Sequence, residues 1–186
     1  MNAAEIKSLI GKRPIQVAQE MHRGQRYGEG GVFENHLIPV AKIANRIARS
    51  LGCSKEDTTH VRDLSWLHDA PEDTGLTGEI ITFLFDKRLG DDSEALNKYH
   101  GDGNKKTLDE YYRDISKNID AKIVKTADRY MNIFTLPNTQ REKAIRMYKR
   151  YRDEYEYYKK YNIFPEIIWK VLEDTRIILE RDGYKK

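Results

Sequence analysis

Apolar residues recur every three or four positions through most of the chain, a spacing that places them on one face of a helix. No stretch sustains the alternation of apolar and polar residues that is typical of a half-buried strand. We therefore predict an all-α fold, a helical bundle of about seven or eight helices, in a single domain that spans residues 1–186. The pattern is clearest in five segments, at 14–26, 37–51, 119–136, 139–161 and 165–181.

Short polar signals mark the ends of the predicted helices. Thr107 and Glu110 have the spacing of a capping box, in which each side chain bonds the backbone N–H of the other residue. Thr139 and Glu142 have the same spacing. Both pairs therefore predict a helix that begins just after the threonine. The glycine-rich stretches predict two loops, at 24–31 and 99–106.

Composition narrows the class of protein. The chain has 186 residues, with 33 Lys and Arg against 30 Asp and Glu, and a formal net charge of +3. This length suits one compact domain, and the near balance of charge argues against a strongly charged disordered tail. No apolar run approaches the roughly 18 residues that a membrane span needs. A single cysteine, Cys53, leaves no partner for an internal disulfide. We therefore expect a cytoplasmic protein without membrane contact.

The first candidate site lies around an adjacent histidine and aspartate, His68 and Asp69. Pro71 follows closely and removes a backbone donor, so we expect the helix to end or kink there, with Glu72 and Asp73 on a turn. A histidine and three carboxylates gathered at a helix end can bind a divalent cation and orient a water molecule. The alternative is a helix terminus with exposed acidic residues.

The second candidate site lies on the predicted helix 119–136. Asp128 and Asn132 are four positions apart and share a face, which Lys125 joins. The helix is otherwise apolar, and a buried carboxylate needs a partner or a metal. The alternative is an ion pair of Asp128 with Lys125 or Arg129 on a solvated face. His36, at the start of an apolar helix, is by itself more often a cap or a surface residue.

Taken together, these signals resemble a known pattern. The stretches 22–44, 64–85 and 121–136 follow the order and spacing found in the HD superfamily of metal-dependent phosphohydrolases. They are most similar to the hydrolase domain of RelA/SpoT-type enzymes and to the small alarmone hydrolases. The resemblance implies an all-α HD-domain bundle, in agreement with the helical periodicity.

The resemblance also implies roles for individual residues. His36, His68, Asp69 and Asp128 match the metal ligands of the family. Glu72 and Asp73 match the pair that handles the attacking water. The positions that match or lie near substrate contacts are Arg26, Tyr27, Lys125 and Asn132.

The implied reaction is hydrolysis of the 3′-diphosphate of guanosine tetra- or pentaphosphate, (p)ppGpp, which gives GDP or GTP and pyrophosphate. The implied cofactor is one divalent metal ion, in this family most often Mn²⁺. Two imidazoles and two carboxylates also suit iron, cobalt, nickel or zinc, so the ligand types alone do not select manganese.

Several positions depart from the family pattern. Leu37, rather than a proline, follows His36, and Pro71 replaces an aliphatic residue. Tyr27 and Gly28 stand where basic residues often contact the nucleotide. Two alternatives therefore stay open. One is the same metal centre acting on another phosphorylated nucleotide, such as the 2′-phosphate of NADPH or a nucleoside monophosphate. The other is a nucleotide-sensing or partner-binding module without turnover.

The segment 141–161 combines tyrosines with positive charge. It holds 8 Lys and Arg against 4 Asp and Glu, and Tyr148, Tyr151, Tyr155 and Tyr158 recur at helical spacing. Basic and aromatic residues together are typical of single-stranded nucleic-acid binding. Because the tyrosines follow the helical period, we instead expect them to pack against the domain, so nucleic acid is not the predicted partner. The sequence leaves the oligomeric state open.

Overall fold

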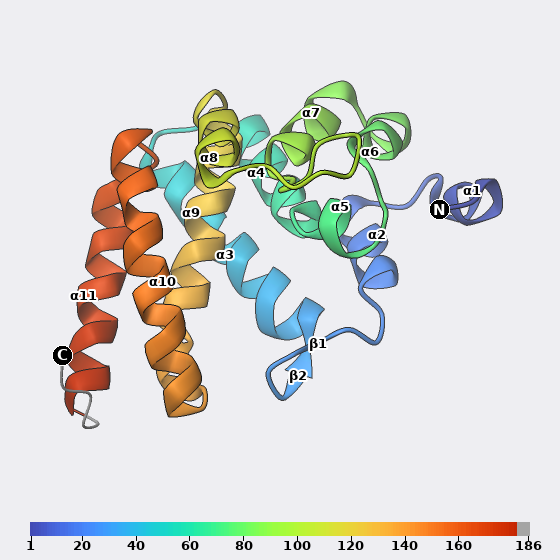
Figure 1. Ribbon diagram of the computed structural model, residues 1–186. Coiled ribbons are helices and arrows are strands. Elements are labelled where there is room, and N and C mark those ends of the chain that lie inside the picture. The colour runs from blue at the N-terminus through green and yellow to red at the C-terminus, as the bar shows by residue number, and fades with distance from the viewer. Residues whose placement is uncertain (182–186) are drawn as a thin grey trace.

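The computed structural model describes residues 1–181 and confirms the all-α prediction (Figure 1). Residues 182–186 of the predicted domain lie outside the described part. The described helices, each longer than a single turn except α5, are α1 (Ala3–Leu9), α2 (Pro14–Met21), α3 (Ile38–Ser50), α4 (Lys55–Leu67), α5 (Ala70–Asp73), α6 (Gly78–Leu84), α7 (Lys87–Ala95), α8 (Leu108–Ser116), α9 (Ile119–Phe134), α10 (Arg141–Lys160) and α11 (Pro165–Arg181).

Three smaller elements complete the described chain. Two-residue strands β1 (Arg26–Tyr27) and β2 (Gly30–Gly31) pair antiparallel as a hairpin in the first predicted loop. A π-helix, η1 (Phe33–Leu37), runs directly into α3, and a 3₁₀ turn, η2 (Leu136–Asn138), connects α9 to α10. The second predicted loop is confirmed as an irregular segment with one isolated bridge, between Tyr99 and Lys105.

The predicted number of helices is too low. Residues 1–181 contain eleven α-helices, and the additional ones are α1, α5, α6 and α7. These helices are nine residues long or shorter, and two turns present too few apolar positions for a helical period to stand out in the sequence. Gly90 on α7 lies close to Gly78 on α6, so these two short helices are held by close packing rather than by a long apolar stripe.

Two predicted helix starts and ends also need correction. The helix predicted over 14–26 ends at Met21, and Gly24 takes a positive φ of 82° that terminates it. The capping box of Thr107 and Glu110 is present at the start of α8. The corresponding box of Thr139 and Glu142 does not form, because the Thr139 hydroxyl donates to the Leu136 carbonyl instead, at 2.8 Å.

Helix α9 lies at the centre of the bundle. It packs against α3 and α4 on one side and against α8 and α11 on others, and most of its residues are buried (Figure 1). Four of those buried residues are charged, which is unusual for a core helix and makes α9 a candidate location for a functional site. They are Asp120, Lys125, Asp128 and Arg129.

The tyrosines of α10 face the protein interior. Tyr148, Tyr151 and Tyr158 are buried, and the half-buried Tyr155 contacts the Trp169 ring on α11 at 5.4 Å between centroids. The packing interpretation of this segment is thereby confirmed. Among the described helices, none is both long enough and apolar enough to cross a bilayer.

Candidate metal centre

His68 lies at the C-terminal end of α4 with its ring fixed by the helix. Its Nδ1 lies 2.9 Å from the Ser65 carbonyl oxygen, one turn earlier. A carbonyl accepts only, so Nδ1 carries the proton in the neutral ring and Nε2 presents a lone pair. Nε2 is buried and makes no well-aligned hydrogen bond among the described residues, and its nearest polar neighbour is the Asp69 carboxylate, at 3.1 Å. A histidine held through one nitrogen, with the other nitrogen bare, is arranged as a metal ligand is.

His36 is placed by the π-helix that precedes α3. Pro39 has no N–H to donate to the Asn35 carbonyl, and its ring would press against that carbonyl in a regular turn. The turn widens, and the Ile38 N–H bonds the Phe33 carbonyl five residues back. His36 is buried within this widened turn, and its ring stacks on Tyr27 at 4.7 Å between centroids. Stacking on Tyr27 and the carboxylates that face Nε2 therefore hold its orientation, since Nδ1 has no hydrogen-bond partner in residues 1–181.

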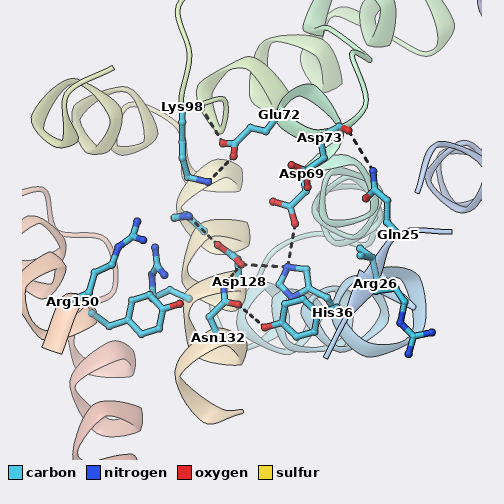
Figure 2. Close-up of a pocket in the computed structure, with 15 residues that line it drawn as sticks. Gln25, Arg26, His36, Asp69, Glu72, Asp73, Lys98, Asp128, Asn132 and Arg150 are labelled. Atoms are coloured by element: carbon cyan, nitrogen blue, oxygen red, sulfur yellow. Dashed lines mark hydrogen bonds and ion pairs between the residues drawn. The ribbon is translucent and has the colours of Figure 1, made fainter. Parts of the chain in front are cut away.

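The four predicted ligands come from three parts of the chain, with His36, His68 and Asp69 in one compact group and Asp128 beside its two imidazoles. Asp69 follows the end of α4, and Asp128 lies on the buried face of α9. Oδ2 of Asp69 is 3.2 Å from Nε2 of His36 and 3.1 Å from Nε2 of His68. Oδ1 of Asp128 is 3.4 Å and 3.9 Å from the same two nitrogens. Figure 2 shows His36 between Asp69 and Asp128.

Three of these separations, at 3.1–3.4 Å, fit the edges of a metal coordination shell, and the fourth, between Asp128 and His68, is longer at 3.9 Å. Ligands about 2.0–2.2 Å from one ion lie roughly 3.0–3.5 Å from each other in octahedral or tetrahedral geometry. The donor set of two imidazole nitrogens and two carboxylate oxygens suits a first-row divalent metal. The two rings face two carboxylates. Nε2 of His68 is buried and makes no well-aligned hydrogen bond in residues 1–181, so it is available to bind such an ion. The residues present therefore fit a divalent cation.

Without an ion, a proton on His68 compensates the negative charge of the two carboxylates. Burial alone favours the neutral ring of His68, but the Asp69 and Asp128 carboxylates outweigh it and raise the pKa of His68 to about 9. Burial likewise opposes the charge on Asp128, whereas Lys125 and His68 hold the pKa of that carboxyl well below its usual range. The site is thus built for a positive charge at its centre.

Lys125 and Asn132 contact Asp128 rather than open pocket space. Lys125 Nζ donates to Oδ2 of Asp128 at 2.9 Å, and its side chain is only 4% exposed. Asn132 Nδ2 donates to Oδ1 of Asp128 at 2.6 Å. Both residues line the pocket, and their polar groups hold the Asp128 carboxylate, so their predicted role as substrate contacts stays a prediction.

The other two predicted substrate contacts, on β1, differ from each other. The Tyr27 hydroxyl donates to Oδ1 of Asn132 at 2.7 Å, so this tyrosine braces the site. Arg26 is exposed, and its guanidinium bonds the Glu29 carbonyl across the hairpin. Figure 2 shows the Arg26 side chain directed away from Asp69 and Asp128. In this structure the guanidinium does not face the candidate metal position.

The two predicted water-handling acids lie on the single-turn helix α5 and have different surroundings. Glu72 is bound at both oxygens by Lys98, through its backbone N–H at 3.1 Å and its Nζ at 2.6 Å. The Asp73 carboxylate makes no hydrogen bond or ion pair within the described residues. Burial raises the pKa of Asp73, and the neighbouring Asp69 and Glu72 charges raise it further. Asp73 is therefore the better placed of the two to accept a proton.

A pocket of about 620 Å³ opens beside these residues. The wall opposite the β1–β2 hairpin carries cations that the sequence reasoning did not assign, Lys98, Arg129 and Arg150, together with Tyr151. Arg150 is 57% exposed, whereas Arg129 is buried and lies 4.2 Å from the centre of the Tyr151 ring. The excess of positive charge in 141–161 was the available signal for Arg150 alone, because Lys98 and Arg129 lie outside that segment.

A second His/Asp group lies away from the pocket, where α4, α7 and α9 meet. Nε2 of His60 is 2.7 Å from Asp92 and 3.8 Å from Asp120. Arg88 bonds Asp120 at 2.6 Å and Asn118 bonds Asp92, so charges and amides already satisfy these carboxylates. We interpret this group as an ion-pair network that ties the three helices together.

No known protein-family model matches this chain. The function proposed for the pocket therefore stands on the residue pattern and the contacts given above.

Proposed function

We propose that this chain is a metal-dependent phosphohydrolase of the HD superfamily, similar to RelA/SpoT-type hydrolase domains and small alarmone hydrolases. The proposed reaction removes pyrophosphate from the 3′ position of (p)ppGpp, with Mn²⁺ as the expected ion. The observation that carries the proposal is the approach of His36, His68, Asp69 and Asp128 within 3.1–3.9 Å across the imidazole–carboxylate pairs. All four would bind the ion.

A divalent cation held by these four residues would neutralise phosphate oxygens and would lower the pKa of a water in its coordination shell. Asp73 accepts a proton from the attacking water as its oxygen forms a bond to phosphorus. The bond from phosphorus to the 3′-oxygen breaks, and that oxygen takes a proton from solvent. Glu72, whose charge is paired with Lys98, lies beside Asp73 on α5 and offers a further carboxylate to orient the water.

The positively charged wall supports a substrate with more than one anionic group. Arg150 reaches into the pocket from α10, and Lys98 approaches from the segment before the 99–106 loop (Figure 2). Both cations are partly exposed, with side-chain exposures of 57% and 34%, so they are able to meet a ligand. Fixed cations around a phosphoryl group stabilise the charge that spreads over its oxygens in the transition state.

One observation favours the second candidate, in which the same centre hydrolyses another phosphorylated nucleotide. On the hairpin side of the pocket, Arg26 turns away and Tyr27 is bonded to Asn132. On that side, where RelA/SpoT-type domains often carry basic residues, the one cation lining the pocket among the described residues is Arg26, and its guanidinium is bonded to the Glu29 carbonyl. A substrate with fewer phosphates, such as a nucleoside monophosphate or NADPH, fits a pocket that is cationic on one wall.

A substrate panel tests both candidates. Purified protein is incubated with ppGpp, NADPH and nucleoside monophosphates, with Mn²⁺ or with EDTA, and the release of pyrophosphate or phosphate is measured. We expect Mn²⁺-dependent turnover of ppGpp that Asp73→Asn lowers at least a hundredfold with metal binding retained. Turnover of NADPH or a monophosphate alone would favour the second candidate. No metal-dependent release from any nucleotide would contradict both.

A further inference from the structure

We infer that His22 and Gln25 are positioning residues that hold Asp73 at the mouth of the pocket. The inference rests on the proposed function, because Asp73 is the residue assigned to the attacking water. Neither His22 nor Gln25 contacts the candidate metal ligands directly. Their effect reaches the pocket through the backbone of α5.

Gln25 links the hairpin to α5 over a sequence separation of 48 residues. Its Nε2 donates to the backbone carbonyl of Asp73 at 3.3 Å, as Figure 2 shows. Its Oε1 lies 2.7 Å from Nδ1 of His22. The Asp73 carbonyl accepts only, so the amide nitrogen of Gln25 must face it, and the amide oxygen then accepts from the His22 ring. Both ends of the carboxamide are thus used.

His22 anchors the Gln25 side chain at the end of helix α2. It caps the C-terminus of α2, where its backbone N–H bonds the Ala18 carbonyl at 3.0 Å, and its ring is 2% exposed. Helix α2 packs directly on α4, which carries His68. Because Nδ1 donates to Gln25, Nε2 is left as a bare, buried acceptor within the described chain. The ring therefore acts as an immobile donor to Gln25.

Helix α5 needs support from outside. It is a single turn of four residues, closed by bonds from the Glu72 and Asp73 N–H groups to the Asp69 carbonyl at 3.2 and 3.0 Å. A single turn fixes several dihedral angles for few hydrogen bonds and is not stable alone. Its last carbonyls have no partner within the helix, and Gln25 caps one of them. Losing that bond allows the turn, and the Asp73 carboxylate with it, to move.

The test compares matched variants. Gln25→Met keeps the length of the side chain and removes both hydrogen bonds. His22→Asn keeps a donor near the position of Nδ1, whereas His22→Leu does not. Gln19→Met, an exposed position on α2, is the control. We expect Gln25→Met and His22→Leu to lower kcat about tenfold, with KM and Mn²⁺ affinity within twofold of the wild type, and His22→Asn to recover most of the loss.

A second readout does not require activity. Hydrogen exchange of the Asp73 and Thr74 amides, measured by NMR in metal-free protein, is expected to accelerate at least tenfold in Gln25→Met and to stay unchanged in Gln19→Met. Unchanged exchange in Gln25→Met would overturn the inference, and so would a loss of Mn²⁺ affinity parallel to the loss of kcat. If the wild type hydrolyses no nucleotide, the proposed function fails, and the exchange experiment still tests whether Gln25 holds the turn.

Discussion

The Tyr27 hydroxyl donates a 2.7 Å hydrogen bond to the side-chain oxygen of Asn132, 105 positions further along the chain. Asn132 in turn donates to Oδ1 of Asp128, the oxygen that faces the His36 and His68 rings. The Tyr27 ring also stacks on His36. One tyrosine on the hairpin therefore contacts one candidate ligand directly and orients another through an amide.

This relationship predicts that Asn132 controls metal affinity. Asn132→Ala removes the donor that fixes Oδ1 of Asp128, and loss of such a supporting bond typically weakens metal binding about 10- to 100-fold. Tyr27→Phe keeps the stack on His36 and loses only the hydroxyl, so a smaller loss is expected. Isothermal titration with Mn²⁺ measures both variants. Affinity of Asn132→Ala within twofold of the wild type would contradict the assigned role.

The two residues are also expected to act as one unit. Because Tyr27 reaches Asp128 only through Asn132, the double variant should bind Mn²⁺ about as weakly as Asn132→Ala alone. Additive losses in the double-mutant cycle would show that the hydroxyl acts by another route.

Metal binding is expected to stabilise the fold. A ligand that binds only the native state adds about 2.7 kcal/mol to the free energy of unfolding at a hundred times its dissociation constant. Mn²⁺ should therefore raise the melting temperature of the wild type, and EDTA should reverse the rise. His68→Ala, which removes a candidate ligand, should abolish the shift. His100→Ala, on a side chain that is 43% exposed and outside the pocket, should keep it.

Much of the fold and part of the candidate site can be predicted from local sequence patterns. Long helices with a clear apolar period, such as α9 and α11, were predicted within two residues at each end. Adjacency singled out His68 and Asp69, and the i,i+4 spacing singled out Asp128 and Asn132, whereas the full set of four ligands, with His36, followed only from the resemblance to the HD superfamily. The structure brings all four predicted ligands together.

The contacts that require tertiary structure were not predictable in this way. Lys98 reaches Glu72 over 26 positions through an irregular segment that shows no period. The ion pair of Lys125 with Asp128 depends on burial by neighbouring helices. A residue expected to contact substrate therefore contacts a candidate metal ligand, Asp128, instead. Short helices such as α7 are fixed by packing against several neighbours, chiefly α6, and a sequence shows neither those neighbours nor their distances.

Close packing between α6 and α7 gives a stability prediction at Gly90. A Cβ there would meet Thr82 Oγ1 and would lie 2.5 Å from the Gly78 carbonyl oxygen. The threonine side chain can rotate, but the carbonyl belongs to a helix backbone, so α6 must shift. Alanine favours helix by about 1 kcal/mol over glycine. The overpacking cost exceeds this gain, and we expect Gly90→Ala to lose roughly 1–3 kcal/mol of unfolding free energy in urea denaturation.

Gly101→Ala is the control for this measurement. A Cβ at Gly101 meets nothing within 4 Å, and its φ lies outside the left-handed region. Its unfolding free energy should stay within about 0.5 kcal/mol of the wild type. Equal stabilities of the two variants would mean that the α6–α7 contact is looser than the structure has it.

The buried pair of Arg129 and Glu154 predicts a stability that depends on pH. The two side chains are 8% and 4% exposed and approach to 2.6 Å. Burial opposes the charge on Glu154, but Arg129, followed by Lys125 and Arg150, outweighs it and holds the pKa of Glu154 below its ordinary value of 4.5. The ionised form is thus favoured in the native state. Its stabilisation is complete above pH 4.5 and is lost as the pH falls through the lowered native pKa.

Glu154→Gln tests this pair because it keeps the shape and removes the charge that compensates Arg129. Breaking a buried pair on one side typically costs about 3–5 kcal/mol, and we expect a loss of this size in urea unfolding at pH 7. The difference from the wild type should shrink toward pH 3, where Glu154 of the wild type begins to be protonated. Glu156→Gln, on a side chain of the same helix that is 67% exposed, should change stability by less than about 1 kcal/mol at either pH. A loss for Glu154→Gln that is independent of pH would mean that packing, rather than charge, carries the contribution of Glu154.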